Sequence, residues 1–365
     1  MKHKFINVLC NGRQVGRLAE TPERVLAFEY DTGWLRDGFS ISPFHLPLEK
    51  QVFFAKQKPF GGIFGVFQDS LPGGWGMILF NRMLKNNNID PSAVSALDRL
   101  AIVGTNGIGA LEYKPEEKLT GEESQSNLDD LAVEIESIVN DNEYGQLLEE
   151  LFASGGSSGG ARPKVYRKID GIEWLIKFRA GHDPKSIGKI EFDYMKAARA
   201  AGLMVPETRL FNDKYFAAKR FDRKPDGSKV FMISASGLLE ISHEALMLDY
   251  NDLMKATFDL TRDIREVEKM FRLMCFNIFA HNRDDHARNF SFLYDDGKWM
   301  VAPAYDLVYN LGIGLTREHA TMVDSEGKNP TDTNILSVSA KASIPQRRAE
   351  EIMEEVRTAV KKAKL

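Results

Sequence analysis

The chain has 365 residues, with 48 Lys and Arg against 52 Asp and Glu, and its formal net charge is -4. Hydrophobic residues make up 43% and charged residues 27% of the sequence. This composition is typical of soluble globular domains and excludes disordered, fibrous and membrane-embedded classes. The small negative charge also excludes a global attraction to nucleic acid or anionic lipid.

The two cysteines and the N-terminus indicate the compartment. Cys10 and Cys275 are too few and too far apart in sequence for a disulfide framework or a zinc site, so we expect reduced, inert thiols. The first ten residues lack the apolar core of a signal peptide. A cytoplasmic protein with no membrane contact is therefore predicted.

Residues 1–118 are predicted to form a small strand-rich segment with one helix. Two short apolar strands, 8–10 and 15–18, flank Asn11-Gly12, a dipeptide that supplies the positive φ angles of a tight hairpin. Helical spacing predicts a helix over 75–84, ended by Asn86-Asn87-Asn88. Residues 115–130 are polar and rich in turn formers, and we interpret them as a linker.

After the linker, amphipathic helices are predicted over 128–139 and 144–152. A glycine- and serine-rich segment, 154–164, follows and is called the Gly/Ser loop here. Strands are predicted over 165–168 and 174–178, joined by Asp170-Gly171, and a helix over 187–201. Two more strands are predicted over 215–220 and 229–233, and a helical pattern begins beyond Ser236. In that pattern a buried stripe is predicted at Val267, Met270, Phe271, Met274, Cys275 and Ile278. We therefore expect three segments, 1–118, 119–236 and 237–365.

The Gly/Ser loop is a weak signal alone. Its glycines would let backbone N–H groups approach a polyanion, and Lys164 would add a positive charge. The same composition is common in flexible linkers. The loop does not match the Gly-x-x-x-x-Gly-Lys-[Ser/Thr] phosphate-binding pattern, because Val165 follows Lys164.

Lys177 stands inside an apolar strand, where lysines are rare unless they are paired. It is either a lysine at a sheet edge whose ammonium group reaches water or the strand lysine of a protein-kinase-like site. In the second interpretation it holds nucleotide phosphates and pairs with a glutamate of the following helix. Glu191 lies at the right place in the chain for that partner.

The strongest pattern is the segment 281–289, called the Asp284 loop here. Arg283-Asp284 and Asn289 reproduce the R-D-x-x-x-x-N spacing of a protein-kinase catalytic loop, in which the Asp accepts the substrate hydroxyl proton and the Asn binds metal. A predicted hairpin of two strands, 290–293 and 298–301, joined across Asp295-Asp296-Gly297, then leads to Asp306. This carboxylate is placed like the second metal ligand of such a site.

Two neighbours of Asp284 have open roles. His286 either shapes the loop by hydrogen bonding or contacts phosphate. Asp285 adjoins Asp284, and like charges so close would raise the pKa of one of them. The base role goes to Asp284 on spacing alone.

Three motifs together carry a family resemblance: Gly159-Gly160-Ala161-Arg162-Pro163-Lys164, then 282–289, then Ala302-Pro303-Ala304-Tyr305-Asp306-Leu307. With them the chain resembles the HipA family, which are serine/threonine-protein kinase toxins of bacterial type II toxin–antitoxin systems. The resemblance implies an α+β, two-lobed, protein-kinase-like fold related to phosphoinositide kinases, with a strand-rich N-terminal lobe and a helical C-terminal lobe.

The resemblance also implies the site. Lys177 would hold ATP phosphates, Asp284 would be the catalytic base, and Asn289 and Asp306 would bind Mg²⁺. The implied ATP-binding residues are Ser158, Gly159, Gly160, Ala161, Arg162, Lys164, Lys177, Ile233, Ser234, His286, Arg288, Asn289 and Asp306. The segment 232–239 departs from the family pattern, because it lacks the acidic hinge of the best-known member.

Regulation and partners follow from the same resemblance. A serine of the Gly/Ser loop would be autophosphorylated, which expels the loop; Ser157 matches that position best and Ser158 is second. A helix-turn-helix antitoxin would neutralise the protein, and DNA would be contacted only through it. The substrate would be a protein, such as an aminoacyl-tRNA synthetase or another translation factor.

Two other functions stay open. The residues His281, Asp284, Asp285 and His286 could instead be metal ligands of a phosphohydrolase, although Lys177 and the Gly/Ser loop would then have no role. The chain could also be a catalytically dead kinase fold that acts only as a transcriptional co-repressor.

Overall fold

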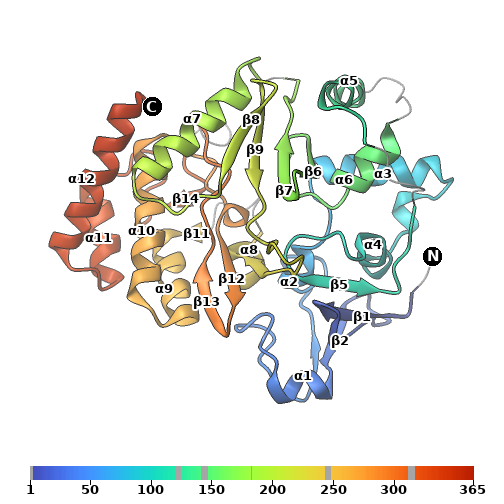
Figure 1. Cartoon of the computed structure of the whole chain (residues 1–365). Helices are drawn as coiled ribbons and strands as arrows, with labels where there is room; N and C mark the ends of the chain where they lie inside the picture. Colours follow the sequence, from blue (N-terminus) through green and yellow to red (C-terminus); the bar gives the residue numbers. More distant parts are fainter. Residues whose placement is uncertain (1–2, 120–124, 141–146, 182, 243–247, 311–316) are drawn as a thin grey trace. The chain divides into compact units, whose positions relative to one another are not determined.

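The computed structural model describes residues 3–119, 125–140, 147–181, 183–242, 248–310 and 317–365, and every structural statement below concerns these residues (Figure 1). Contacts divide the chain into two compact units. The first unit is Met1–Lys189 with Arg209–Phe231, and the second is Ile190–Thr208 with Met232–Leu365. Each unit is described by itself. The predicted division at 118 and 236 stays a prediction.

The first unit begins with an antiparallel five-stranded sheet in the order β4-β3-β2-β1-β5. Its strands are β1 (Phe5–Cys10), β2 (Arg13–Glu20), β3 (Leu26–Tyr30), β4 (Val52–Phe54) and β5 (Leu111–Lys114). The predicted hairpin is confirmed: Asn11 and Gly12 have φ angles of 49° and 77°, the left-handed values that such a turn requires.

The expectation of a single helix in 1–118 is wrong. The structure has α1 (Thr32–Asp37), α2 (Gly65–Gln68), α3 (Trp75–Asn86), a 3₁₀ turn at Pro91–Ala93, and α4 (Ala96–Val103). Only α3 is long enough to show clear helical periodicity. The start of α4 carries a capping box, in which Ser95 and Asp98 exchange side-chain and backbone hydrogen bonds. That signal was present in the sequence.

A second sheet of the first unit has the order β6-β7-β9-β8. Its strands are β6 (Lys164–Ile169), β7 (Ile172–Lys177), β9 (Tyr215–Lys219) and β8 (Thr208–Phe211). The helix predicted over 128–139 is confirmed as α5 (Leu128–Val139). The next helix is α6 (Leu148–Gly155), while 144–146 of its predicted span lie outside the described residues. Strand β8 was not predicted.

The core of this sheet is apolar and shared with the helices. Leu131, Ile135 and Ile138 of α5 pack in one cluster with Trp174 and Ile176 of β7. Helix α3 packs against α6, and α6 contacts β6. These contacts place the start of β6 relative to the start of α3. The Gly/Ser loop ends at β6 and is hydrogen-bonded to the start of α3, as described below.

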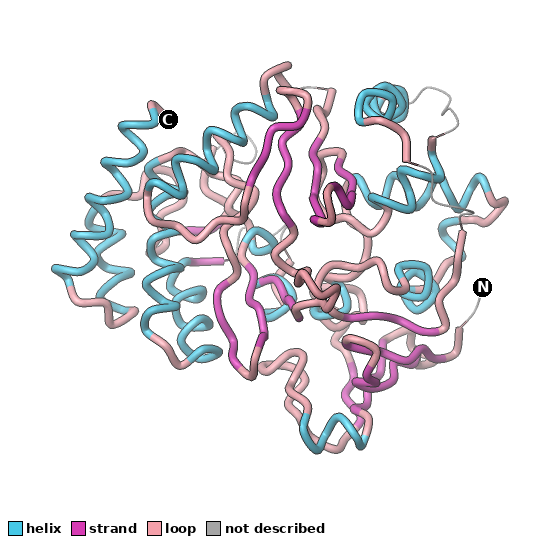
Figure 2. The backbone as a smooth tube through the Cα atoms, viewed as in Figure 1, coloured by secondary structure: helices cyan, strands magenta, loops and turns pink. Residues whose placement is uncertain are grey.

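The second unit is mostly helical, as predicted (Figure 2). The chain enters it within α7 (Ile187–Ala200), and its other helices are α8 (Ala235–Leu239), α9 (Tyr250–Thr261), α10 (Ile264–Phe279), α11 (Asp332–Lys341) and α12 (Gln346–Ala363). The predicted buried stripe on α10 is confirmed, from Val267 to Ile278. Helix α10 packs against α9 and α12.

Short strands complete the second unit. A three-stranded sheet has the order β10-β12-β13, and β11 pairs with β14 in parallel. The strands are β10 (Phe231–Ser234), β11 (Leu248–Asp249), β12 (Ser291–Asp295), β13 (Lys298–Val301) and β14 (Thr321–Met322). The predicted hairpin between β12 and β13 is confirmed, and its turn uses φ angles of 47° at Asp296 and 76° at Gly297.

Among the described residues, no helix combines the length and apolar character needed to cross a membrane. Both cysteines are buried and free, and burial raises the pKa of the Cys10 thiol to about 12. These thiols are therefore protonated at neutral pH, as the sequence predicted for inert cysteines.

Candidate active site

The Gly/Ser loop runs from the end of α6 to the start of β6, and backbone groups at the start of α3 hold it. The carbonyl oxygens of Ser158 and Gly160 accept hydrogen bonds from the backbone N–H groups of Gly73 at 3.3 Å and Trp75 at 2.9 Å. A Cβ atom on Gly76 would lie 2.3 Å from the Ser158 oxygen. Glycine is therefore required there by the close approach of two backbones.

The two candidate serines of this loop have different surroundings. The Ser157 hydroxyl is partly accessible and donates a hydrogen bond of 2.7 Å to the carbonyl oxygen of Asn106. The Ser158 side chain is completely buried, and its hydroxyl has no hydrogen-bond partner among the described residues. Only Ser157 has its hydroxyl near the surface in this conformation.

Two lysines face each other where the Gly/Ser loop ends. In the antiparallel pair β6–β7, Lys164 is the direct partner of Lys177, so both side chains stand on one face of the sheet. Their exposed fractions are only 5% and 9%. The ammonium group of Lys164 donates to the carbonyl oxygen of Gly159 at 2.6 Å, and that of Lys177 lies 5.5 Å from the Phe216 ring. Two ammonium groups on one face of the sheet would both offset the charge of an anion bound there.

Arg162, also in the Gly/Ser loop, pairs with a carboxylate of the same unit. Its guanidinium nitrogens lie 3.2 Å from the two oxygens of Asp183. The predicted contact of Arg162 with a nucleotide would have to compete with this ion pair.

In the second unit, side chains on both sides of Asp284 anchor the Asp284 loop. Asn282 donates its backbone and side-chain N–H groups to the backbone and side-chain oxygens of Asn277 on α10, both at 2.9 Å. The Asp285 carboxylate is completely buried and receives hydrogen bonds from Tyr250, His319 and the backbone. Asp284 lies between these anchors and is only partly buried. Of the two adjacent carboxylates, Asp284 is the accessible one.

Asn289 and Asp306 belong to segments that hydrogen bonds tie to Asp284. The side-chain amide nitrogen of Asn289 donates to the carbonyl oxygen of Asp284 at 2.6 Å, which leaves the amide oxygen of Asn289 as the acceptor for a ligand. The Tyr305 hydroxyl donates to the carbonyl oxygen of Arg288 at 2.7 Å. It therefore fastens the residue next to Asp306 to the Asp284 loop.

The backbone of Asp306 is strained. Its φ angle is 53°, in the left-handed region that costs a non-glycine residue about 1 kcal/mol or more. His281, at the start of the Asp284 loop, also has a φ angle of 53°, and its carbonyl oxygen accepts a hydrogen bond of 3.0 Å from the backbone of Asn310. Burial, with the nearby charge of Arg283, lowers the pKa of His281. Such strained positions concentrate at functional sites.

For three other predicted ATP-binding residues, His286, Ile233 and Ser234, the structure gives local contacts and burial, and their contact with ATP stays a prediction. The His286 ring nitrogen Nδ1 accepts a hydrogen bond of 3.2 Å from the backbone of Arg288, and His286 caps the 3₁₀ turn Ala287–Asn289. This geometry agrees with the loop-shaping role of His286. Ile233 is completely buried, and the Ser234 hydroxyl caps α8 by accepting from the backbone of Gly237 at 3.0 Å.

The alternative metal cluster finds no support. Within the described part of the chain, no three His, Cys, Asp or Glu side chains are grouped so that they could hold a metal ion. Asp285 and His286, two of its four members, are occupied by the hydrogen bonds given above. By contrast, one carboxylate and one amide oxygen, from Asp306 and Asn289, suit Mg²⁺, which takes few protein ligands and keeps several waters.

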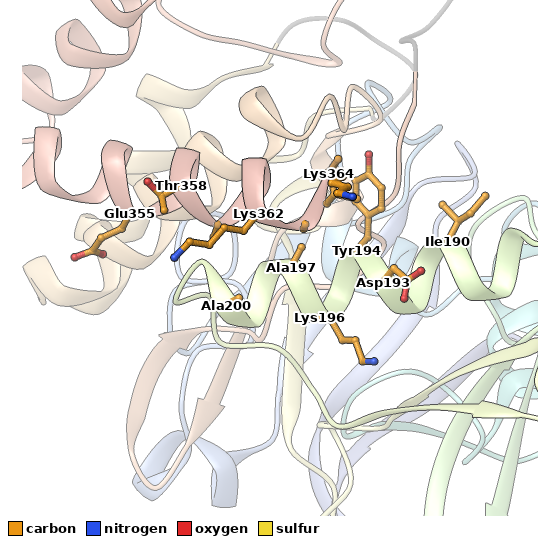
Figure 3. A pocket seen from close by; sticks show the side chains of 13 residues that line it. Ile190, Asp193, Tyr194, Lys196, Ala197, Ala200, Glu355, Thr358, Lys362 and Lys364 are labelled. Atoms are coloured by element: carbon orange, nitrogen blue, oxygen red, sulfur yellow. The ribbon is translucent and has the colours of Figure 1, made fainter.

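The structure thus assembles two partial sites. Lys164, Lys177 and the Gly/Ser loop belong to the first unit, while Asp284, Asn289, Asp306 and Glu191 belong to the second. The ion pair of Lys177 with Glu191 stays a prediction. A cavity of about 660 Å³ also exists in the second unit, between α7 and the end of α12, and holds none of the predicted catalytic residues (Figure 3).

Comparisons with known proteins identify the class. Residues 6–114 match the HipA N-terminal domain and residues 156–364 match the HipA-like C-terminal domain. The chain belongs to the HipA family. Its fold is similar to that of a solved structure, the Shewanella oneidensis MR-1 toxin–antitoxin complex of HipA, HipB and operator DNA. The TM-score is 0.73 and the sequence identity is 17%. The match covers 98% of this chain and 89% of that one.

Two curated relatives come from Sinorhizobium fredii. "Putative kinase Y4mE" is 27% identical over 342 residues, which cover 84% of this chain and 78% of that protein. "Putative kinase Y4dM" is 25% identical over 156 residues, which cover 38% of this chain and only 37% of that protein.

Three residues of the site were missed by reasoning from the sequence: Asn106, Tyr250 and His319. Tyr305 stands in one of the three motifs, but its hydrogen bond to Arg288 was not predicted. The opposition of Lys164 and Lys177 was missed too, but a signal for it existed. The turn at Asp170-Gly171 pairs Ile169 with Ile172, and counting outward along both strands brings the two lysines together. For Asn106, Tyr250 and His319 no local pattern was available.

Proposed function

We propose that this protein is an ATP-dependent serine/threonine protein kinase, and that it acts in the cytoplasm as the toxin of a type II toxin–antitoxin pair. The observation that carries the proposal is the arrangement around Asp284. The neighbouring Asp285 is buried in hydrogen bonds, and the carbonyl oxygen of Asp284 orients Asn289. Tyr305 fastens the segment of Asp306 to the same loop. A kinase needs an accessible carboxylate beside two oxygen ligands for a metal ion.

The residues divide the work of phosphoryl transfer. Lys164, Lys177 and the Gly/Ser loop would offset the charge of the ATP phosphates. Asp284 would accept the proton of the substrate hydroxyl. The hydroxyl oxygen would form a bond to the γ-phosphorus of ATP, and the bond between the γ-phosphorus and the bridging oxygen of ADP would break. Asn289 and Asp306 would hold Mg²⁺, which neutralises charge on the phosphate oxygens.

Partners are proposed from the family. The structure of the Shewanella oneidensis relative contains HipB and operator DNA. This supports an antitoxin as a partner. The proposed antitoxin is a helix-turn-helix protein, and the proposed contact with DNA is only through it. The substrate is proposed to be a protein, such as an aminoacyl-tRNA synthetase or another translation factor.

We also propose autophosphorylation at Ser157, with Ser158 as the second choice. The Ser157 hydroxyl is near the surface, whereas Ser158 is completely buried. Phosphorylation of Ser157 would remove its hydrogen bond to Asn106 and add about two negative charges, so the loop would leave its present position.

The test is the intact mass of the full chain after incubation with Mg-ATP. We expect one added phosphate, mapped to Ser157, and its loss when Mg²⁺ is chelated. Ser157→Ala should abolish the added mass and Ser158→Ala should not. If the chain binds ATP but phosphorylates neither itself nor any protein of a bacterial extract, the co-repressor alternative is supported. Manganese-dependent phosphodiester hydrolysis would support the phosphohydrolase.

A further inference from the structure

The second unit contains a buried polar network beneath the Asp284 loop, and its centre is Asp285. One carboxylate oxygen accepts from the Tyr250 hydroxyl at 2.8 Å and lies 3.0 Å from Nδ1 of His319. The other oxygen accepts from the backbone of Ala320 at 2.9 Å and of Thr321 at 3.3 Å. A buried carboxylate needs this many donors to offset its lost hydration.

The network closes a ring with the other anchor of the loop. The Tyr250 hydroxyl accepts from the side chain of Asn277 at 3.0 Å, and Asn277 accepts from the side chain of Asn282 at 2.9 Å. Tyr250 starts α9, and Asn277 lies on α10. Asn282 and Asp285 are therefore fastened to the same pair of helices, and the two residues between them, Arg283 and Asp284, have little freedom.

A second connection holds His319 and Thr321 in place. Strand β14 pairs in parallel with β11, which immediately precedes Tyr250, and Leu248 is the partner of Thr321. The Thr321 hydroxyl also donates to the backbone oxygen of Asp285 at 2.5 Å. Donors from α9 and from the 319–321 segment thus converge on one residue.

Stability alone does not explain such a network, because a buried ionic cluster is often no more stabilising than apolar side chains of the same volume. Its particular effect is to define one geometry. We propose that Asp285, Tyr250 and His319 form a positioning network that holds the Asp284 carboxylate in its reactive place. This inference rests on the proposed kinase function and deepens it.

Tyr250 is suited to this role. Burial, and then the adjacent charge of Asp285, raises the pKa of its hydroxyl well above the usual value. The phenol therefore stays protonated at neutral pH and remains a donor to Asp285.

The first experiment measures kcat and the KM for ATP of Tyr250→Phe in the full chain. The matched control is Tyr113→Phe, since Tyr113 is equally buried and its hydroxyl bonds to Ser70 at 2.6 Å in the first unit. A hydrogen bond to a buried charge is worth a factor of roughly 10 to 100. We expect kcat to fall by that factor in Tyr250→Phe, with the KM for ATP within about twofold, and no such fall in the control.

Rescue at His319 separates positioning from packing. In His319→Asn the amide can replace Nδ1 as the donor to Asp285, so we expect it to retain most of the activity. His319→Leu fills the space without a donor and should lose activity as Tyr250→Phe does. Equal activity of the two variants, or equal kcat of Tyr250→Phe and Tyr113→Phe, overturns the proposal.

A readout without catalysis keeps the inference separate from the proposed function. Hydrogen exchange of the backbone amides in 281–289 should be faster in Tyr250→Phe and His319→Leu than in the wild type and in Tyr113→Phe. If the wild type transfers no phosphate, the kinase proposal fails and this exchange decides whether the network positions the loop. Unchanged exchange in both variants overturns the inference.

Discussion

The Gly/Ser loop and the Asp284 loop are held by opposite means. In the Gly/Ser loop, backbone oxygens of Ser158 and Gly160 rest on peptide groups at the start of α3, and one surface hydroxyl reaches Asn106. In the Asp284 loop, the completely buried side chain of Asp285 is fixed by four donors. A neutral peptide hydrogen bond contributes little net free energy, because the peptide groups can bond to water instead, but a buried carboxylate cannot lose its donors without large cost. We therefore expect the first loop to move more readily than the second.

A buried carboxylate also supports the Gly/Ser loop, but only indirectly. Asp222 accepts from the guanidinium groups of Arg220 at 2.7 Å and Arg223 at 2.9 Å and from the backbone of Gly109 at 2.8 Å. Arg223 also donates to the carbonyl oxygen of Gly107 at 2.9 Å. This cluster positions the segment that contains Asn106, and Asn106 in turn holds Ser157.

The largest expected effect tests the fixed loop. Asp284→Asn removes the proposed base, and we expect phosphoryl transfer to fall between about 100-fold and 10,000-fold with an unchanged melting temperature. Asp296→Asn is the matched control, since Asp296 is exposed in the β12–β13 turn and Asn tolerates its φ of 47°. Radioactive phosphate incorporation measures both. Wild-type activity in Asp284→Asn would show that another group is the base.

The next effect concerns stability. Asp222→Asn leaves two buried guanidinium groups without their carboxylate, so we expect a loss of about 3–5 kcal/mol in the free energy of unfolding. Denaturant unfolding measures it. Asp226→Asn, at an exposed turn four residues later, is the control. A loss no larger than that of the control would mean that this cluster does not stabilise the first unit.

The same carboxyl predicts a dependence on pH. Burial raises the pKa of Asp222, but the charges of Arg220 and Arg223 outweigh it and lower this pKa below 3.8. The pKa of Asp222 is lower in the folded state than in the unfolded state. The stabilisation of the folded state by the ionised Asp222 is therefore fully present above pH 3.8 and is lost as the pH falls through the folded pKa. Acid unfolding followed by circular dichroism should therefore be steeper in the wild type than in Asp222→Asn. Parallel curves would contradict this.

The smallest effect tests the movable loop. In Gly76→Ala the new Cβ would lie 2.3 Å from the Ser158 oxygen and should push the Gly/Ser loop off α3. Overpacking costs about 1–3 kcal/mol, and the better helix propensity of Ala returns about 0.5–1 kcal/mol. We expect a small net loss of stability and faster hydrogen exchange in 156–163. Gly159→Ala is the control, because open space surrounds its Cβ position. Equal exchange in both variants would show that α3 does not hold the loop.

Local patterns in the sequence predicted much of this molecule. The turns at Asn11-Gly12, Asp170-Gly171 and Asp296-Gly297, helix α5 and the stripe of α10 depend on neighbouring residues, and all are confirmed. The spacing of Asp284, Asn289 and Asp306 was also visible. Short helices such as α1 and α2 were missed, because one turn of helix has too little periodicity to be recognised.

Only the tertiary structure separated the two adjacent carboxylates. By spacing alone Asp284 and Asp285 differ by one position, but the groups that sequester Asp285 are 35 residues before it, at Tyr250, and 34 after it, at His319. In the same way, Ser157 meets Asn106 across 51 residues. Backbone angles of turns and helices follow from local sequence, whereas burial and hydrogen-bond partners are set by segments that folding brings together. For that reason the sequence determined which residues are candidates, and the fold decided which of them are accessible for chemistry.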